Sequence, residues 1–173
     1  RNMRPDAIIV CIHWGDEFTH QTSKEQRELT DWLLAQGVDH IIGNHPHVVQ
    51  PLEIRKSPMT PDRNVVAYST GNLVSNMSLR RTDGGMMIAM KLLKILNYTR
   101  PRDVRYLLTW IAPKSEDGKR DFTIYPAATT EIDGWEYAEQ KRQLFINDCR
   151  SLFDKHNKGD IREMSTDTVR ISR

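Results

Sequence analysis

The chain has 173 residues, of which 38% are hydrophobic and 28% charged, a composition typical of one ordinary globular domain. Its formal net charge is only +2, so it lacks the basic excess of a dedicated nucleic-acid binder, and we expect no nucleic-acid partner. No apolar run approaches the roughly 18 residues that a membrane-spanning helix needs. Because the first residue is Arg1 and a strand pattern follows almost at once, we expect a piece of a longer polypeptide.

The first 43 residues show a strand, a helix and a second strand. A continuous apolar run over Ala7–Ile12 predicts a strand covered on both faces, with the thiol of Cys11 buried. A second apolar segment over Val38–Gly43 predicts the next strand. Strand, helix and strand form a βαβ unit, so the two strands should be parallel neighbours.

The helix between these strands is predicted by its capping residues. Thr22-Ser23-Lys24-Glu25 fits a capping box, so we expect a helix over Thr22–Gln36, followed by Gly37 at its C-terminal end. Leu29, Trp32 and Leu33 are spaced to form its apolar stripe.

The middle of the chain is rich in strand patterns. We expect strands over Asn64–Ser69, Gly84–Ile95, Val104–Ala112 and Asp121–Tyr125. The last two flank Asp117-Gly118, a strong hairpin signal. The basic pairs Arg55-Lys56 and Arg80-Arg81 are interpreted as solvated faces.

A second helix closes the predicted domain. Asp133-Gly134-Trp135-Glu136 is a capping-box candidate, and the helix should stop near Gly159. We expect one face of it to carry Tyr137, Leu144, Phe145, Leu152 and Phe153. The domain is therefore predicted over residues 1–159, with residues 160–173 as a loosely held polar tail.

Three of the six histidines follow predicted strands directly. His13 comes after the first strand, and His45 and His47 come after the second. The carboxyl ends of parallel strands meet at one edge of a sheet, which is where open α/β sheets place their ligands. Because imidazole is both a common metal ligand and a usable general base, these residues are candidate ligands and catalytic groups. The alternative is that they are surface histidines bonded to local backbone; His40 and His156 are interpreted as structural.

Other polar residues could join this edge. Asp16 and Glu17 could add oxygen ligands or orient an imidazole, and the alternative is a solvated pair. Asn72 follows Gly71 after another predicted strand, and it could donate to a substrate oxygen or simply complete a turn.

Three segments resemble the CapA family, the bacterial capsule synthesis or poly-γ-glutamate biosynthesis proteins. They are His13-Trp14-Gly15-Asp16-Glu17, Gly43-Asn44-His45-Pro46-His47-Val48-Val49-Gln50-Pro51 and Tyr68-Ser69-Thr70-Gly71-Asn72. The resemblance covers roughly the first 75 residues. Residue 44 is a histidine in the commoner pattern, so Asn44 leaves the role of that side chain, including substrate binding, open.

The resemblance implies a fold and a metal centre. The CapA family is related to the calcineurin-like metallophosphatases, so we expect the C-terminal half of a four-layer α/β/β/α sandwich. It implies that His13, His45 and His47 are ligands of a divalent Mn, Zn or Fe ion, and that His13, His45 and Glu17, the motif glutamate, are the catalytic residues. It also implies that further carboxylate ligands lie before Arg1. With those ligands missing, we expect the chain to bind at most one ion weakly and to lack hydrolase activity alone.

Three functions remain open at this stage. The first is a CapA-like role in making or exporting an anionic polymer, with metal-dependent hydrolase chemistry in the full-length protein. The second is a phosphoesterase unrelated to capsule, and the third is a non-catalytic polymer-binding scaffold. The resemblance also implies an extracytoplasmic location, partners in membrane-associated capsule machinery, and an anionic polymer or phosphoester substrate. Uncovered sheet surface would favour self-association.

Overall fold

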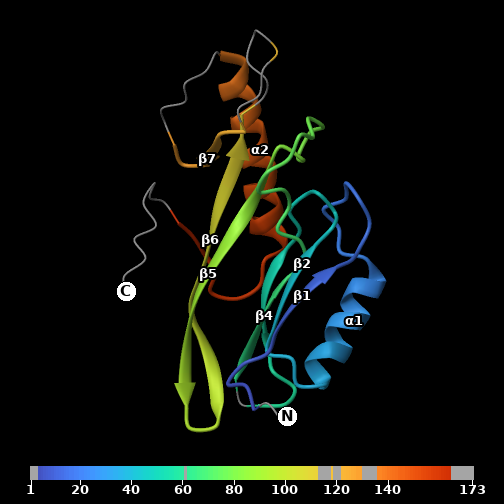
Figure 1. The fold of residues 1–173 in the computed structure, drawn as a ribbon, viewed down its shortest axis with the longest axis vertical. Helices are drawn as coiled ribbons and strands as arrows, with labels where there is room; N and C mark the ends of the chain where they lie inside the picture. The colour runs from blue at the N-terminus through green and yellow to red at the C-terminus, as the bar shows by residue number, and fades with distance from the viewer. Residues whose placement is uncertain (1–3, 61, 113–117, 119–121, 130–135, 165–173) are drawn as a thin grey trace.

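The computed structural model describes residues 4–60, 62–112, 118, 122–129 and 136–164. These residues form a mixed α/β fold with two sheets and two helices, which confirms the predicted fold class (Figure 1). The elements in chain order are β1 (Ile9–His13), α1 (Lys24–Ala35), β2 (His40–Asn44), β3 (Leu52–Lys56), β4 (Arg63–Ala67), β5 (Gly84–Ile95), β6 (Tyr98–Ile111), β7 (Ile124–Pro126), α2 (Glu136–His156) and β8 (Arg162–Glu163).

The predicted βαβ unit is confirmed. β1 and β2 are parallel neighbours, with Ile9 opposite His40 and His13 opposite Asn44. α1 connects them, and its N-cap is Ser23, one residue later than Thr22. The side chain of Gln26 completes the capping box by accepting the Ser23 N–H, while the Ser23 hydroxyl accepts the Gln26 N–H.

The predicted apolar stripe of α1 is largely wrong. Leu29 and Trp32 are 38% and 58% exposed, whereas Gln26, Thr30 and Leu34 are the buried residues. The Gln26 amide donates to Gln50 Oε1 at 2.9 Å, so a buried polar contact sets which face of the helix turns inward. Hydrophobicity along the helix alone could not reveal that partner.

The first sheet has the order β1-β2-β4-β3, with β1 at its edge. β2 and β4 are parallel, and β3, which was not predicted, pairs antiparallel with β4. α1 packs over one face through a cluster that contains Trp14, Ile41 and Tyr68 (Figure 1).

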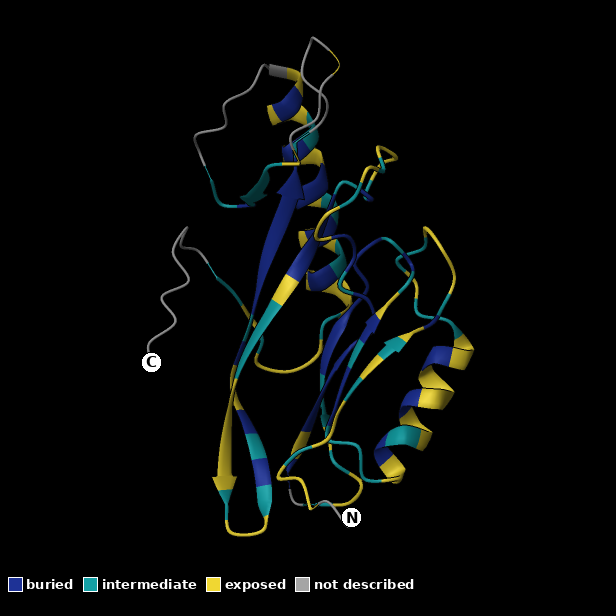
Figure 2. Cartoon of the chain, viewed as in Figure 1, coloured by how far each residue is buried: buried dark blue, intermediate teal, exposed yellow. Residues whose placement is uncertain are grey.

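The prediction that the first strand is covered on both faces is wrong. Its residues alternate between exposed and half-buried, and Cys11 is exposed (Figure 2). The physical reason is its edge position, because no described strand pairs with its outer side. The apolar run nevertheless predicted the strand itself.

The second sheet is built on the long β5–β6 hairpin. β5 has the predicted bounds, β6 begins at Tyr98, earlier than the predicted Val104, and β7 pairs antiparallel with β6. Of the hairpin signal Asp117-Gly118 only Gly118 is described, and the predicted capping box at residues 133–136 lies mostly outside the described residues. The predicted tail starts too early, because β8 pairs with β6.

α2 packs into the main core with a face different from the predicted one. Tyr137 and Leu144 are 45% and 44% exposed, while Phe145 and Phe153 are buried as expected. The core joins residues of both sheets and this helix, and its buried α2 members are Ala138, Phe145, Ile146, Cys149 and Phe153. Beyond the helix, Asn157 Oδ1 accepts the Leu52 N–H at 2.8 Å, which fixes the end of α2 against β3.

Candidate metal site at the carboxyl edge of the first sheet

The three predicted histidines lie together. His13 is the last residue of β1, and His45 and His47 follow β2 directly. The ring centroids of His13 and His45 are 4.3 Å apart, and those of His45 and His47 are 6.1 Å apart. The parallel pairing of β1 and β2 brings them together, because both chains leave the sheet at the same edge.

A carboxylate completes the strongest ligand group. One ligand atom from each of Glu17, His45 and His47 lies within 4.8 Å of the others. Glu17 Oε1 and His47 Nε2 are 3.7 Å apart. Asp16 is outside this group, and so is His13, whose ring instead contacts that of His45. Of the two candidate carboxylates, the fold therefore selects Glu17.

The hydrogen bonds of Asn72 define the tautomer of His47. The Asn72 amide nitrogen donates to the carbonyl of Thr82 at 2.8 Å, so its Oδ1 is the atom that faces His47. Since Oδ1 only accepts, His47 Nδ1 carries the proton of this 3.0 Å bond. In the neutral imidazole, Nε2 then carries the lone pair, on the side that faces Glu17.

This arrangement differs from the substrate-binding role expected for Asn72. The residue is buried, and its amide nitrogen also approaches the sulfur of Met77 at 3.6 Å. With its N–H groups directed to Thr82 and Met77, Asn72 supports His47 and offers no described donor toward a substrate. Asn44, the other substrate candidate, is exposed, and its Oδ1 accepts the backbone N–H of His45 at 2.9 Å.

The backbone around the histidines is held in sparsely populated conformations. His45 has φ 109° and His47 has φ 58°, in the left-handed region that side chains with a Cβ rarely adopt. Just before them, a Cβ on Gly43 would collide with the Tyr68 carbonyl and the Trp14 indole nitrogen. This close approach leaves room for the 2.7 Å hydrogen bond from Trp14 Nε1 to the Tyr68 carbonyl, which ties the loop after β1 to the end of β4.

A buried amide network holds the loop that carries Glu17. Gln50 Nε2 donates to the carbonyls of Thr19 and Gln21, while Gln50 Oε1 accepts from Gln26. His20 Nδ1 bonds the Val49 carbonyl at 2.6 Å, and Phe18 stacks on the His47 ring at a centroid distance of 5.9 Å. Of these residues, the motif containing Gln50 was visible in the sequence, but neither the capping role of Gln26 nor its contact with Gln50 was predicted.

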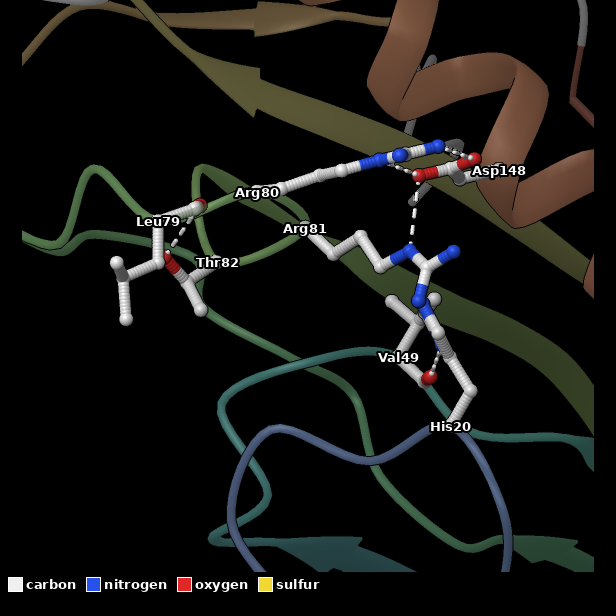
Figure 3. A network of polar contacts seen from close by, with 7 residues as sticks. All are labelled: His20, Val49, Leu79, Arg80, Arg81, Thr82 and Asp148. Carbon is white, nitrogen blue, oxygen red and sulfur yellow. Dashed lines mark hydrogen bonds and ion pairs between the residues drawn. The ribbon is translucent and has the colours of Figure 1, made fainter.

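The sequence predicted that Arg80 and Arg81 form a solvated face, but in the structure both side chains have a carboxylate partner. Both guanidinium groups bond the carboxylate of Asp148 on α2, at 2.8–2.9 Å (Figure 3). Burial acts to raise the pKa of Asp148, but the two arginines outweigh it and hold that pKa below its usual value. The arginine pair therefore links the loop after Asn72 to α2.

The remaining histidines lie outside the Glu17–His45–His47 group. His40 is fully buried in β2, where its Nδ1 accepts the Val65 N–H of β4 at 3.1 Å. His156 is exposed at the end of α2. Both positions agree with the structural roles predicted for them.

Comparison with known proteins identifies the family. Residues 1–77, which contain all the site residues named above from His13 to Asn72, match the model of the family described as "Bacterial capsule synthesis protein PGA_cap". The chain is 33% identical over 156 residues to the PGA biosynthesis protein CapA of Bacillus subtilis (strain 168), an alignment that covers 87% of the chain. The chain belongs to the CapA family.

The relatives are longer than this CapA-family chain. The alignment covers 38% of the Bacillus subtilis protein. The capsule biosynthesis protein CapA of Bacillus anthracis is 31% identical over 83 residues, which cover 48% of the chain and 19% of that protein. No described helix is long and apolar enough to cross a membrane.

Proposed function

We propose that this chain serves in the biosynthesis of a bacterial capsule polymer of the poly-γ-glutamate type, and that Glu17, His45 and His47 bind a divalent metal ion. Its membership of the CapA family supports the biosynthetic role, since both relatives carry capsule or PGA biosynthesis in their names. The observation that carries the metal site is the Glu17–His45–His47 group.

The geometry of the group suits a metal ion. Nitrogen and carboxylate ligands lie about 2.0–2.2 Å from zinc, so two ligands of one ion are separated by up to about 4 Å. The 3.7 Å between Glu17 Oε1 and His47 Nε2 already falls in that range. The hydrogen bond from His47 Nδ1 to Asn72 is the kind of outer support that metal-binding histidines require.

The protein residues around the group have separate roles. Glu17 supplies negative charge, and His45 and His47 supply neutral nitrogen ligands. His13, on the far side of His45, is placed to contact a substrate or to hold a second ion together with residues of a longer polypeptide. A bound ion would supply Lewis-acid chemistry toward an ester or amide oxygen. With three described ligands and one carboxylate, we expect the chain alone to bind at most one ion, weakly, and to show no hydrolase activity.

The first prediction tests metal binding. Purified chain titrated with Mn²⁺ or Zn²⁺ in a calorimeter should bind no more than one ion, and His45→Ala and Glu17→Gln should each weaken binding at least tenfold because each removes a ligand. Elemental analysis of the dialysed protein provides an independent count of bound metal.

His156→Ala is the matched control, because it removes an exposed histidine outside the group and should leave affinity unchanged. Equal affinity in wild type and both site variants would refute the metal site. Two tightly bound ions with metal-dependent phosphodiester turnover would instead favour a self-sufficient phosphoesterase. Complete absence of metal would favour a non-catalytic scaffold.

We also propose that the protein works outside the cytoplasm beside membrane-associated capsule machinery. This location is supported by the process itself, since a capsule polymer lies outside the cell.

A further inference from the structure

A small cavity lies between the loop that follows Asn72 and helix α2. It has a volume of about 110 Å³, and its polar lining comes from Ser78, Arg80, Arg81, Asp83 and Lys141, with Phe145 as an apolar wall. None of these residues belongs to the Glu17–His45–His47 group. The cavity is therefore separate from the candidate metal site.

The cationic side chains of this cavity keep hydrogen-bonding capacity. Asp148 bonds Nε and Nη2 of Arg80 but only Nε of Arg81. A guanidinium group has five N–H donors in a planar fork, so both arginines retain donors for a second acceptor. Asp148 holds the two side chains in place, and Lys141 adds a third positive charge to the lining.

Asp83 gives the same cavity an acceptor that lacks a donor. Its Oδ2 accepts from the indole of Trp110 at 3.1 Å, whereas its Oδ1 is buried and has no hydrogen-bond partner among the described residues. A buried carboxylate oxygen without a partner is costly, so a ligand that brings an N–H group would satisfy it.

We propose that this cavity is a subsite for one unit of an amide-linked polycarboxylate, with the carboxylate of the unit on Arg80, Arg81 and Lys141 and its amide N–H on Asp83. This assignment rests on the proposed function and deepens it by locating a polymer-binding residue set. A phosphodiester polymer offers no N–H donor for Asp83, so the lining favours an amino-acid polymer over a phosphate polymer.

A short path connects this subsite to the candidate metal site. Asn72 bonds His47 through its Oδ1 and the Thr82 carbonyl through its amide nitrogen. Thr82 lies between Arg81 and Asp83 in the sequence. One residue thus supports both a metal ligand and the loop that lines the subsite.

The test is the binding of a fluorescent γ-linked glutamate decamer to the 173-residue chain, measured by anisotropy. We expect Lys141→Gln and Arg81→Gln each to weaken binding about tenfold, the usual effect of losing a charge-assisted hydrogen bond. Lys141 makes no described ion pair with a carboxylate, so its variant should fold even if Arg81→Gln does not. Arg102→Gln on β6 is the matched control and should bind like wild type.

Two further measurements separate the possible failures. His45→Ala should lose metal but keep decamer affinity. A wild-type chain that binds the decamer but no metal would refute the proposed metal site and leave the subsite standing. Unchanged decamer affinity in both Lys141→Gln and Arg81→Gln would overturn the subsite. Polyphosphate of similar length that binds as tightly as the decamer, with the same loss in Lys141→Gln, would overturn the preference for an amide-linked polymer.

Discussion

At the scale of single residues, the hydrogen bonds of His47 and Asn72 decide what the candidate metal site can do. The Thr82 carbonyl accepts a hydrogen bond from the amide nitrogen of Asn72, so Asn72 Oδ1 faces His47. Because Oδ1 can only accept, the imidazole nitrogen that bonds it, Nδ1, carries a proton. In the neutral ring, the lone pair is then on Nε2, on the side of Glu17, which is the form that binds a metal ion. Asn72 acts through His47 and is a positioning residue.

Replacing Asn72 should weaken metal binding without removing a ligand. We expect Asn72→Ala to lower metal affinity about 10–100-fold, the usual effect of losing an outer hydrogen-bond partner. Asn72→Asp keeps the acceptor for His47, so it should retain most of the affinity. Calorimetric titration with Zn²⁺ provides the measurement.

Asn147→Ala, on the exposed surface of α2, is the control for the loss of an amide. If Asn72→Ala bound zinc like wild type while keeping its circular dichroism spectrum, the positioning role would be wrong. If Asn72→Asp lost as much affinity as Asn72→Ala, the bond to Thr82 would be the contact that matters.

At the scale of secondary-structure elements, a buried histidine links β2 to β4. His40 Nδ1 accepts the Val65 N–H, and its Nε2 has no hydrogen-bond partner among the described residues. Burial lowers the pKa of His40 below 6.5, although Asp39 and Asp62 act to raise it. Burial likewise lowers the pKa of His20, against the hydrogen bond to Val49. Both rings are therefore favoured in the neutral form when the chain is folded.

The pH dependence of stability follows from these directions. Because the pKa of His40 is lower in the folded chain than when unfolded, its stabilising contribution is present above about pH 6.5 and is lost as the pH falls below it. We expect the free energy of unfolding in urea to fall from pH 7.5 to 5.5, by at most about 1.4 kcal/mol per pH unit for each such group. His40→Asn should reduce the slope, since the Asn amide oxygen can still accept the Val65 N–H.

The exposed His156 provides the comparison, and His156→Asn should keep the slope of wild type. A stability that does not change between pH 7.5 and 5.5, or a slope equal in His40→Asn and wild type, would show that His40 does not control this titration.

At the scale of the whole molecule, the open edge of the first sheet is an uncovered surface. β1 is an edge strand; its first residue, Ile9, is 45% exposed, and the preceding Ile8 is 42% exposed. A hollow of about 370 Å³ continues along Cys11, His13 and Gly43 toward the candidate metal site. An exposed apolar edge strand pairs readily with another chain.

We therefore predict that the chain self-associates through β1. Ile9→Lys should shift the sedimentation coefficient toward the monomer, because a charged side chain on an edge strand opposes pairing. Leu96→Lys changes a residue that is 84% exposed in the β5–β6 turn and should leave association unaltered. A chain that is monomeric at 100 μM, or an Ile9→Lys variant that associates like wild type, would contradict the prediction.

The sequence by itself determined the βαβ unit and the convergence of His13, His45 and His47. Apolar runs and a helix cap are local patterns, and the parallel direction of the strands follows from the connection between them. Residues at the ends of neighbouring parallel strands then meet at one edge without further information. The same segments carried the resemblance to the CapA family, which the comparison confirmed.

Only the tertiary structure decided which neighbours complete that edge. The choice of Glu17 over Asp16, the bond between Asn72 and His47, and the attachment of Arg80 and Arg81 to Asp148 depend on contacts between residues that are 25 to 68 positions apart, or on loop conformation. The sequence also could not predict which faces of α1 and α2 are buried, or that β1 is exposed. Periodicity reports how polarity varies along an element, but which face is buried depends on the elements that pack against it.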